Sequence, residues 1–400
     1  MDEKKKNVPK RRFKEFKNAD AWEQREFFEN IERIIDFRGK TPKKLGLNWS
    51  NQGYLALSAL NVKNGYIDLS VEANYGDESL YSKWMGSNKL EKGQVLFTTE
   101  APMGNIARVP DNKGYILSQR TISFVTKQSK LIDEFLYILL GTQSVKTSLN
   151  SMSSGGTAKG ISQRSLKNLY VTVPSSIEEQ KKIGDTIILI EDTITLHQRK
   201  LEKYKTIKES YLEEMFPAEG QRKPRRRFPG FTDDWEQREL GSESKIIAGG
   251  DVDKYKLISF GKYPVLANAL TNDGIVGYYN KDYRIEAPAI TVTGRGDIGH
   301  AKARRVNFTP TVRLLALKTH HDIDFLEHSI NLYRKVHEST GVPQLTTPQL
   351  AKYKLLIPKI EEQILIGLFL KKFDDTITLH QKKLDKLKKL KEALLEEMFV

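Results

Sequence analysis

The chain contains one long helical segment twice. Residues 192–201 read DTITLHQRKL and residues 375–384 read DTITLHQKKL. The correspondence continues without a gap, at an offset of 183, from 177–216 to 360–399, and 24 of the 40 aligned positions are identical. A repeat of a whole element constrains the fold more strongly than any local pattern. Because 400 residues are enough for two modules of about 100 to 200 residues each, two similar modules are the first expectation.

Both copies of this segment have the apolar spacing of a coiled coil. Apolar residues recur at alternating intervals of three and four, which places them on one seam of a helix. The seam residues are Ile187, Ile190, Ile194, Leu201, Tyr204, Tyr211 and Met215 in the first copy, and Leu370, Phe373, Ile377, Leu384, Leu387, Leu394 and Met398 in the second. His197 and His380 occupy the same seam position in the two copies. A polar residue there more often sets the register than binds a metal.

The repeat also includes a segment that lies far from the helices in the sequence. Trp22–Phe27 (WEQREF) returns as Trp235–Leu240 (WEQREL), and each copy follows the residues Arg-Arg-Phe. We expect both tryptophans to be buried anchors rather than base-stacking residues. The repeated unit is therefore an opening segment, a variable body and a long helix.

The two bodies, at about 28–160 and 241–340, show little similarity to each other. Both contain short β-rich runs, such as 94–98 and 289–293, between turns rich in Gly, Pro and Asn, with a few helical stretches, which predicts α+β domains. The predicted organisation is a first globular domain at 1–175, a central helix at 176–216, a basic linker at 217–227, a second globular domain at 228–358 and a C-terminal helix at 359–400.

The composition limits which cellular compartment and which kinds of partner are expected. Lys and Arg outnumber Asp and Glu by 65 to 51, which gives a net charge of +14 and favours either a polyanionic partner such as nucleic acid or simple solubility. The absence of cysteine excludes disulfides and thiolate zinc sites and suits a reducing cytoplasm. The charged first residues and the short apolar runs predict neither a secretion signal nor a membrane span. We expect a cytoplasmic protein.

Motifs that carry catalytic chemistry are scarce in the sequence. Residues 294–299 (GRGDIG) match a dinucleotide-binding pattern, but the basic stretch that follows predicts a strand rather than the helix this motif requires. There is no phosphate-binding Walker pattern, no H-E-x-x-H, no G-x-S-x-G, and neither a nuclease carboxylate cluster nor an amino-methyltransferase tetrapeptide. The seven histidines are dispersed apart from His320–His321 and lack ligand spacing, so no metal site is expected. We expect a chain without an active site of its own.

Two glycine-bearing turns resemble each other across the bodies. Aligning residues 104–107 (GNIA) with 296–299 (GDIG) indicates a shared loop flanked by basic residues, which suits contact with phosphates or base edges, or else a solvated hairpin. The linker at 221–227 (QRKPRRR) is expected to be exposed, and its charge could also contact phosphates. Chemistry and position select these residues for DNA contact: Arg38, Lys40, Asn105, Arg108, Gln119, Arg120, Lys159, Asn268, Asn272, Arg295, His300, Lys302, Arg304 and Arg305.

The order of these features resembles the specificity subunit of type I restriction-modification systems, by which bacteria restrict foreign DNA. The repeated Ile-Glu-Glu-Gln at 177–180 and 360–363, with the matched Leu-His-Gln helices, carries the resemblance most strongly. Residues 35–42 (IDFRGKTP) and 96–104 (LFTTEAPMG) also look like segments common in the family's target-recognition domains. The resemblance covers nearly the whole chain.

The resemblance implies a fold and a set of partners. The fold would be α+β, with two target-recognition domains separated by the two repeated helices, which pack as an antiparallel coiled coil. Each domain would read one half of a split, asymmetric site in double-stranded DNA. Two methyltransferase subunits holding S-adenosylmethionine would dock on the chain, and restriction subunits using ATP and Mg²⁺ would join them. The chain itself would bind no cofactor and would be non-catalytic.

Two other functions stay open at this point. A stand-alone DNA-binding or architectural protein would bind its sequence tightly without any other subunit. A methyltransferase or nuclease with an unrecognised motif would act as a purified chain, given only cofactor or Mg²⁺.

Overall fold

The structure is a computed structural model that describes residues 7–155, 159–337 and 344–400. The chain divides into two compact units. Unit 1 contains residues 1–196 and 384–400, and unit 2 contains residues 197–383. Each long helix therefore contributes one part to each unit.

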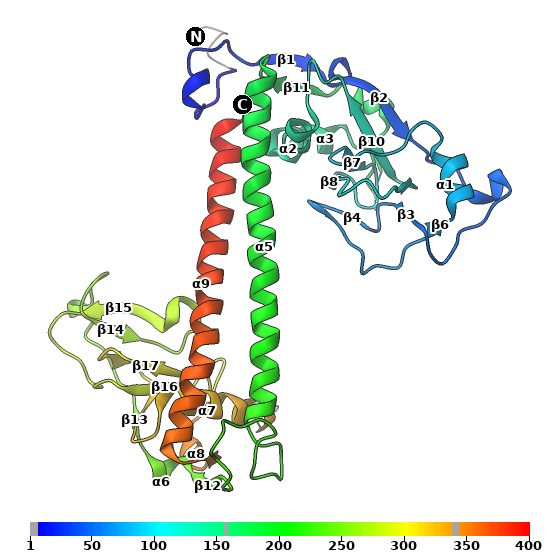
Figure 1. The fold of residues 1–400 in the computed structure, drawn as a ribbon. Coiled ribbons are helices and arrows are strands. Elements are labelled where there is room, and N and C mark those ends of the chain that lie inside the picture. The colour runs from blue at the N-terminus through cyan, green and yellow to red at the C-terminus, as the bar shows by residue number, and fades with distance from the viewer. Residues whose placement is uncertain (1–6, 156–158, 338–343) are drawn as a thin grey trace. The chain divides into compact units, whose positions relative to one another are not determined.

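Unit 1 is built around an antiparallel four-stranded sheet in the order β2-β10-β7-β8 (Figure 1). Smaller sheets have the orders β6-β3-β9, β1-β11 and β4-β5. The strands are β1 (Glu23–Glu26), β2 (Ile31–Asp36), β3 (Tyr54–Leu57), β4 (Val62–Lys63), β5 (Tyr66–Ile67), β6 (Tyr75–Gly76), β7 (Val95–Thr98), β8 (Ile106–Arg108), β9 (Ile116–Leu117), β10 (Thr121–Thr126) and β11 (Tyr170–Val173). The short helices are α1 (Glu78–Met85), α2 (Asp133–Gly141), α3 (Gln143–Met152) and α4 (Gln163–Leu166).

The main core of unit 1 lies between this sheet and the long helices. Strand β7 is buried at all four positions, which is typical of a strand covered on both faces. Helix α2 lies between the sheet and α5 (Ile177–Met215) (Figure 1). Trp22 packs edge-on against Phe135 of α2 and against Phe399, so the opening segment, the body and the C-terminal end of the chain share one apolar core.

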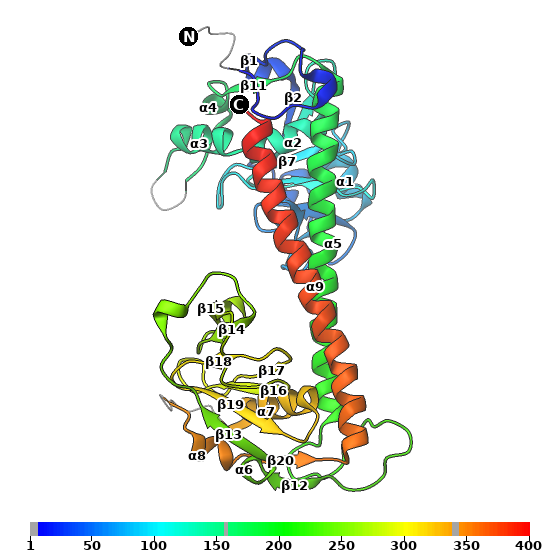
Figure 2. The ribbon, with the colours of Figure 1, turned by 90° about the vertical axis from the view of Figure 1, so that its left-hand side faces the viewer.

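Unit 2 has a four-stranded sheet in the order β13-β19-β16-β17, a three-stranded sheet β15-β14-β18 and the pair β12-β20. Helix α7 lies between the larger sheet and the long helices (Figure 2), with Leu326 and Ile330 in the core on the sheet side and Phe325 against Trp235 and Phe216. The strands are β12 (Glu236–Glu239), β13 (Ser244–Ala248), β14 (Tyr263–Leu266), β15 (Ile275–Tyr279), β16 (Ala289–Thr293), β17 (Ala301–Arg304), β18 (Thr309–Pro310), β19 (Leu314–Thr319) and β20 (Lys354–Ile357), and the helices are α6 (Leu240–Glu243), α7 (Ile323–His337), α8 (Thr347–Ala351) and α9 (Ile360–Met398).

The two bodies share a common topology despite their different sequences. Three sheets of unit 1 correspond strand by strand to the three sheets of unit 2, and in each unit the three-stranded sheet has one antiparallel and one parallel pair. The β4-β5 hairpin of unit 1 has no counterpart among the described residues of unit 2. Strand β12 pairs with β20 as β1 pairs with β11. The repeat therefore extends through the bodies, which the sequence comparison did not reveal.

The long helices pack antiparallel within each unit. In unit 1, Lys391 of α9 pairs with Glu191 of α5 at 2.6 Å, and in unit 2, Lys208 pairs with Asp374 at 2.5 Å. Of the predicted seam residues, eight are buried: Ile187, Ile194, Leu201, Met215, Leu370, Leu384, Leu394 and Met398. Ile190, Phe373, Ile377 and both seam histidines are half-buried. The α+β class with two domains and two long repeated helices is confirmed.

Candidate nucleic-acid interface

In each unit, the segment that precedes the body is fastened to the long helix by a buried ion pair. In unit 1, Arg12 donates from Nε and Nη2 to the two carboxylate oxygens of Glu179, at 2.6 and 2.7 Å. In unit 2, Arg227 donates to both oxygens of Glu362 at the same two distances. Both glutamate side chains are 0% exposed. The second acidic residue of the repeated Ile-Glu-Glu-Gln is thus the partner of the repeated Arg-Arg-Phe.

The glutamine of the same motif holds the body itself. Gln180 accepts a hydrogen bond from the backbone N–H of Ile132 and donates to the carbonyls of Lys130 and Pro174. Gln363 does the equivalent in unit 2: it accepts from the N–H of Asp322 and donates to the carbonyl of Pro358. The contacts with Lys130, Ile132 and Asp322 lie just before the helix, α2 or α7, that packs on the long helix. The motif therefore fixes the same geometry of attachment twice.

Two of the linker arginines, Arg226 and Arg227, form ion pairs with carboxylates of unit 2. Arg226 pairs with Glu214 and lies over the Tyr211 ring, while Arg227 pairs with Glu362. Lys223 lies 3.1 Å from Asp234. These contacts give the repeated arginines a structural role in the linker, which sequence reasoning had considered for phosphate contact.

The two seam histidines face each other in unit 2. Nδ1 of His197 lies 2.7 Å from Nδ1 of His380, and Tyr204 stacks on the His380 ring. Burial, followed by the charges of His197, Lys200 and Lys383, lowers the pKa of His380 below its usual 6.5. A hydrogen bond between the two Nδ1 atoms needs one of them to accept, so the pair is stable only with at least one ring neutral.

This pair predicts a loss of stability in acid. Because the pKa of His380 is lower in the folded than in the unfolded chain, the unfolded chain binds more protons below pH 6.5, and the free energy of unfolding decreases as the pH falls. Urea unfolding at about pH 7.5 and about pH 5 measures this effect. In the His380→Gln variant the acid-induced loss should be smaller; an equal loss would place the acid-sensitive groups elsewhere.

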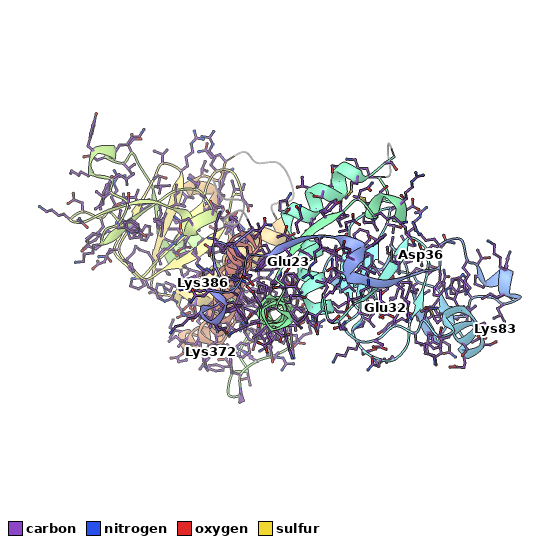
Figure 3. The ribbon with its side chains drawn as sticks, turned by 90° about the horizontal axis from the view of Figure 1, so that it is seen from above. Glu23, Glu32, Asp36, Lys83, Lys372 and Lys386 are labelled. Atoms are coloured by element: carbon purple, nitrogen blue, oxygen red, sulfur yellow. The ribbon has the colours of Figure 1, made fainter. Side chains whose placement is uncertain are left out.

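In unit 1, the predicted DNA-contact residues lie in loops at the ends of strands. Arg38 forms a bidentate pair with Asp36 at the end of β2, and Lys40 donates to the carbonyl of Trp84, next to Lys83 of α1; Asp36 and Lys83 are labelled in Figure 3. Lys40 and Gln119 line one hollow of about 290 Å³, together with Lys43, Asn48 and Trp49.

Other predicted residues of unit 1 are engaged with the protein itself. Arg120 pairs with Glu100, whose backbone bridges to Gly160 beside the exposed Lys159. Asn105 donates to the carbonyl of Val62. Arg108 lies over the Tyr137 ring and 3.9 Å from Asp192 of α5, which places it against the helix.

In unit 2, the fold brings several of the predicted residues together. Asn268 accepts from the backbone N–H of Gly294, beside the exposed Arg295. Arg304 is mostly buried and pairs with Asp273, the neighbour of Asn272. Arg305 pairs with Asp324, and Lys302 is exposed on β17. His300 lies 3.4 Å from Asp297, and burial lowers the pKa of its ring.

The shared glycine loop exists, but the predicted alignment of it is wrong by three residues. In unit 1, the Thr98 N–H donates to the carbonyl of Asn105 and its carbonyl accepts from Gly104. Thr293 makes the same two bonds with His300 and Gly299. Gly104 therefore corresponds to Gly299 rather than to Gly296. No helix directly follows GRGDIG, because β17 begins at Ala301, which confirms the predicted strand.

Exposed apolar side chains mark loops that sequence reasoning missed. In unit 2, Tyr255 is fully exposed and Phe260 is 88% exposed, within the loop 254–263 that also carries Lys254, Lys256 and Lys262. In unit 1, the exposed residues are Leu60, Tyr66 and Leu69, around the β4-β5 hairpin. Large exposed apolar side chains rimmed by charge indicate a binding surface. The alternation of Lys with Tyr and Phe in 254–263 is the sequence feature that could have indicated this binding surface.

Taken together, the repeated topology, the repeated attachment and the differing loops define a duplicated, two-domain protein. Residues 23–206 and 232–389 match the family described as the type I restriction modification DNA specificity domain. The match covers well over half of the chain, and the chain belongs to this family. The predicted specificity subunit is confirmed. Among the described residues, no helix is both long and apolar enough to span a membrane.

Several known proteins are similar to this chain. A putative type I specificity subunit from Mycoplasma pneumoniae is 34% identical over 125 residues, which are 30% of this chain and 34% of that protein. A second from the same organism is 31% identical over 125 residues, 30% of this chain and 37% of that protein. The chain thus spans about a third of the length of these two relatives. The putative specificity subunit of the type I restriction enzyme MjaX from Methanocaldococcus jannaschii is 22% identical over 397 residues, 94% of this chain and 92% of that protein.

One solved structure supports the fold. The crystal structure of the S subunit of a type I restriction-modification system from M. genitalium has a TM-score of 0.71 to this chain, and the match covers 98% of this chain and 99% of that one. Its sequence identity is 16%, so the likeness concerns the fold alone.

Proposed function

We propose that the chain is the DNA-recognition subunit of a type I restriction-modification complex and reads a split, asymmetric site with its two bodies. The observation that carries this proposal is the combination of one topology, used twice, with loops that differ between the copies. A shared scaffold places the two bodies equivalently, and their different loops allow each body to bind a different DNA sequence.

The matched attachments support two copies of one partner. Because Glu179 and Glu362 bind the repeated arginines in the same way, each opening segment is held on its long helix by the same contacts, and we infer that a pair of identical subunits docks equivalently against the two opening segments and helices. In this proposal, two methyltransferase subunits dock there and hold S-adenosylmethionine, and restriction subunits supply ATP- and Mg²⁺-dependent cleavage. Methyl transfer and cleavage belong to those partners, and this chain works non-catalytically in the cytoplasm.

The exposed loops are the proposed DNA contacts. Aromatic side chains stack on bases or wedge between base steps, and neighbouring lysines neutralise phosphates. The loop 254–263 combines both kinds of side chain. The loop residues Arg38, Lys40 and Gln119 of unit 1, and Asn268 and Arg295 of unit 2, stay predictions for direct contact.

The double variant Tyr255→Ala/Phe260→Ala tests this assignment. Base–aromatic contacts are worth about 1–3 kcal/mol each by alanine substitution, so we expect DNA affinity of the assembled complex to fall by at least about tenfold, with recognition relaxed at one half-site. Methylation of cellular DNA by the variant, co-expressed with the modification subunit, reports which half is affected.

The reciprocal variant, Tyr66→Ala in unit 1, is the control. It should act on the other half-site, because Tyr66 belongs to the first body. Equal relaxation of both half-sites by the Tyr255/Phe260 variant would contradict the assignment of one half-site to each body.

A further inference from the structure

We propose that Glu243, His320 and His321 of unit 2 form a binding site for a divalent transition-metal ion such as Zn²⁺. Among the described residues, these three bring one potential ligand atom each to within 4.8 Å of one another. The site is separate from the loops proposed for DNA contact, and it does not depend on the proposed function.

The distances suit a small ion with nitrogen and oxygen ligands. Nε2 of His321 lies 3.0 Å from Oε2 of Glu243, and Nε2 of His320 lies 3.7 Å from the same oxygen. Ligand atoms about 2.0–2.1 Å from Zn²⁺ are about 3.3 Å apart in a tetrahedron. Small side-chain adjustments therefore bring all three groups into the first coordination sphere. Two imidazoles and a carboxylate are a common zinc ligand set that leaves a fourth position open.

Two of the ligands are already held in place. Glu243 ends α6, and its carbonyl accepts a hydrogen bond from the hydroxyl of Thr319 at 3.0 Å. The side chains of Glu243 and His321 are 16% and 9% exposed. His320 is 72% exposed, so its ring is free to turn toward an ion and the fourth position faces solvent.

The hydrogen bonds of His321 determine what an ion must replace. Nε2 of Gln363 lies 3.1 Å from Nδ1 of His321, and it also donates to the Pro358 carbonyl. In the metal-free chain Nδ1 therefore accepts from Gln363, and the Nε2 proton of His321 points to Glu243. An ion at Nε2 needs the ring proton on Nδ1, so binding replaces the hydrogen bond with Gln363.

The site would tie two parts of unit 2 together. Glu243 lies at the end of α6, before β13, and the two histidines connect β19 to α7. An ion would fasten the second body at the point where it is attached to its helix. In unit 1 the corresponding place before α2 holds Lys130 and Leu131, so only the second body would respond to the ion.

Titration of the full, untagged, metal-stripped chain with Zn²⁺, followed by calorimetry, tests the proposal. We expect one Zn²⁺ per chain, and Co²⁺ in its place should give the visible absorption of a four-coordinate site. His320→Ala should weaken Zn²⁺ binding at least about tenfold, and because this side chain is exposed, the variant should fold.

The matched control is His380→Ala, since His197 and His380 form the other close histidine pair. This variant should keep its affinity for Zn²⁺ at the proposed site. Absence of stoichiometric binding, unchanged affinity in His320→Ala, or loss of binding in His380→Ala would each overturn the proposal. A Glu243→Gln variant that binds as the unaltered chain does would also exclude the carboxylate as a ligand.

Discussion

Replacing Arg227 by Ala should destabilise unit 2 by about 3–5 kcal/mol, because it leaves the carboxylate of Glu362 buried without its partner. The Glu362 side chain is 0% exposed, and both its oxygens accept from Arg227. Breaking one side of a buried pair costs far more than the pair contributes, since the remaining charge has lost both water and its counter-charge.

The equivalent change in unit 1, Arg12→Ala, should cost less. The indole N–H of Trp22 donates to Glu179 at 3.3 Å, whereas Nε1 of Trp235 has no hydrogen-bond partner among the described residues. Glu179 therefore keeps one donor after the arginine is lost, and Glu362 keeps none of its side-chain donors. The difference between the two variants also includes the backbone contacts that each arginine makes, to the carbonyls of Ala19 and Asp20 for Arg12 and to that of Asp233 for Arg227.

Urea unfolding of both variants measures these costs. The double variant Arg227→Met/Glu362→Leu is the control, because replacing a whole buried ion pair by apolar side chains is often nearly neutral. It should recover most of the stability that Arg227→Ala loses. If Arg227→Ala lowered the free energy of unfolding by less than about 1 kcal/mol, the ion pair would not be a main contributor to the stability of unit 2.

Replacing Gly184 by Val should cost unit 1 about 2–4 kcal/mol, mainly through a steric clash between helices. A Cβ at Gly184 would lie 2.9 Å from Cβ of Glu134 and 3.1–3.2 Å from backbone atoms of Glu134 and Phe135. The obstacle is the backbone of α2, which cannot move without displacing Phe135 from the core. Gly367, the repeat of Gly184, has the same close approach to Asp322 and Phe325 in unit 2.

The control for this prediction is Gly141→Ala. Gly141 is also helical and belongs to unit 1, but a Cβ there would meet nothing within 4 Å. Alanine should therefore be neutral or stabilise by up to about 1 kcal/mol. If Gly184→Val and Gly141→Ala had similar stabilities in thermal unfolding, the close helix contact would not be a determinant of the fold.

The scaffold could be predicted from the sequence because its interactions are repeated in the sequence. The seam spacing predicted the long helices, and the burial of Trp22 and Trp235, at 2% and 0% exposure, confirms that they are anchors. The Ile-Glu-Glu-Gln motif was recognised as a repeat, but its role required the structure, since Glu179 binds an arginine 167 positions earlier.

The common topology of the bodies could not be predicted in the same way. Their shared order is set by backbone hydrogen bonds between strands, which many apolar sequences satisfy. The loop alignment was wrong because the sequence pattern pairs Gly104 with Gly296. The backbone hydrogen bonds of Thr98 and Thr293 instead make Gly104 equivalent to Gly299. The cluster at Glu243 joins residues 78 positions apart, so no local spacing could indicate it.

We propose that this chain directs a partner's methylation to a split DNA site. The most direct test is co-purification with a modification subunit, followed by sequencing of adenine methylation in DNA exposed to the complex. We expect a bipartite, asymmetric methylated motif that appears only when both proteins are present. Tight, sequence-selective binding by the isolated chain, with no complex formed, would contradict it and favour a stand-alone DNA-binding protein.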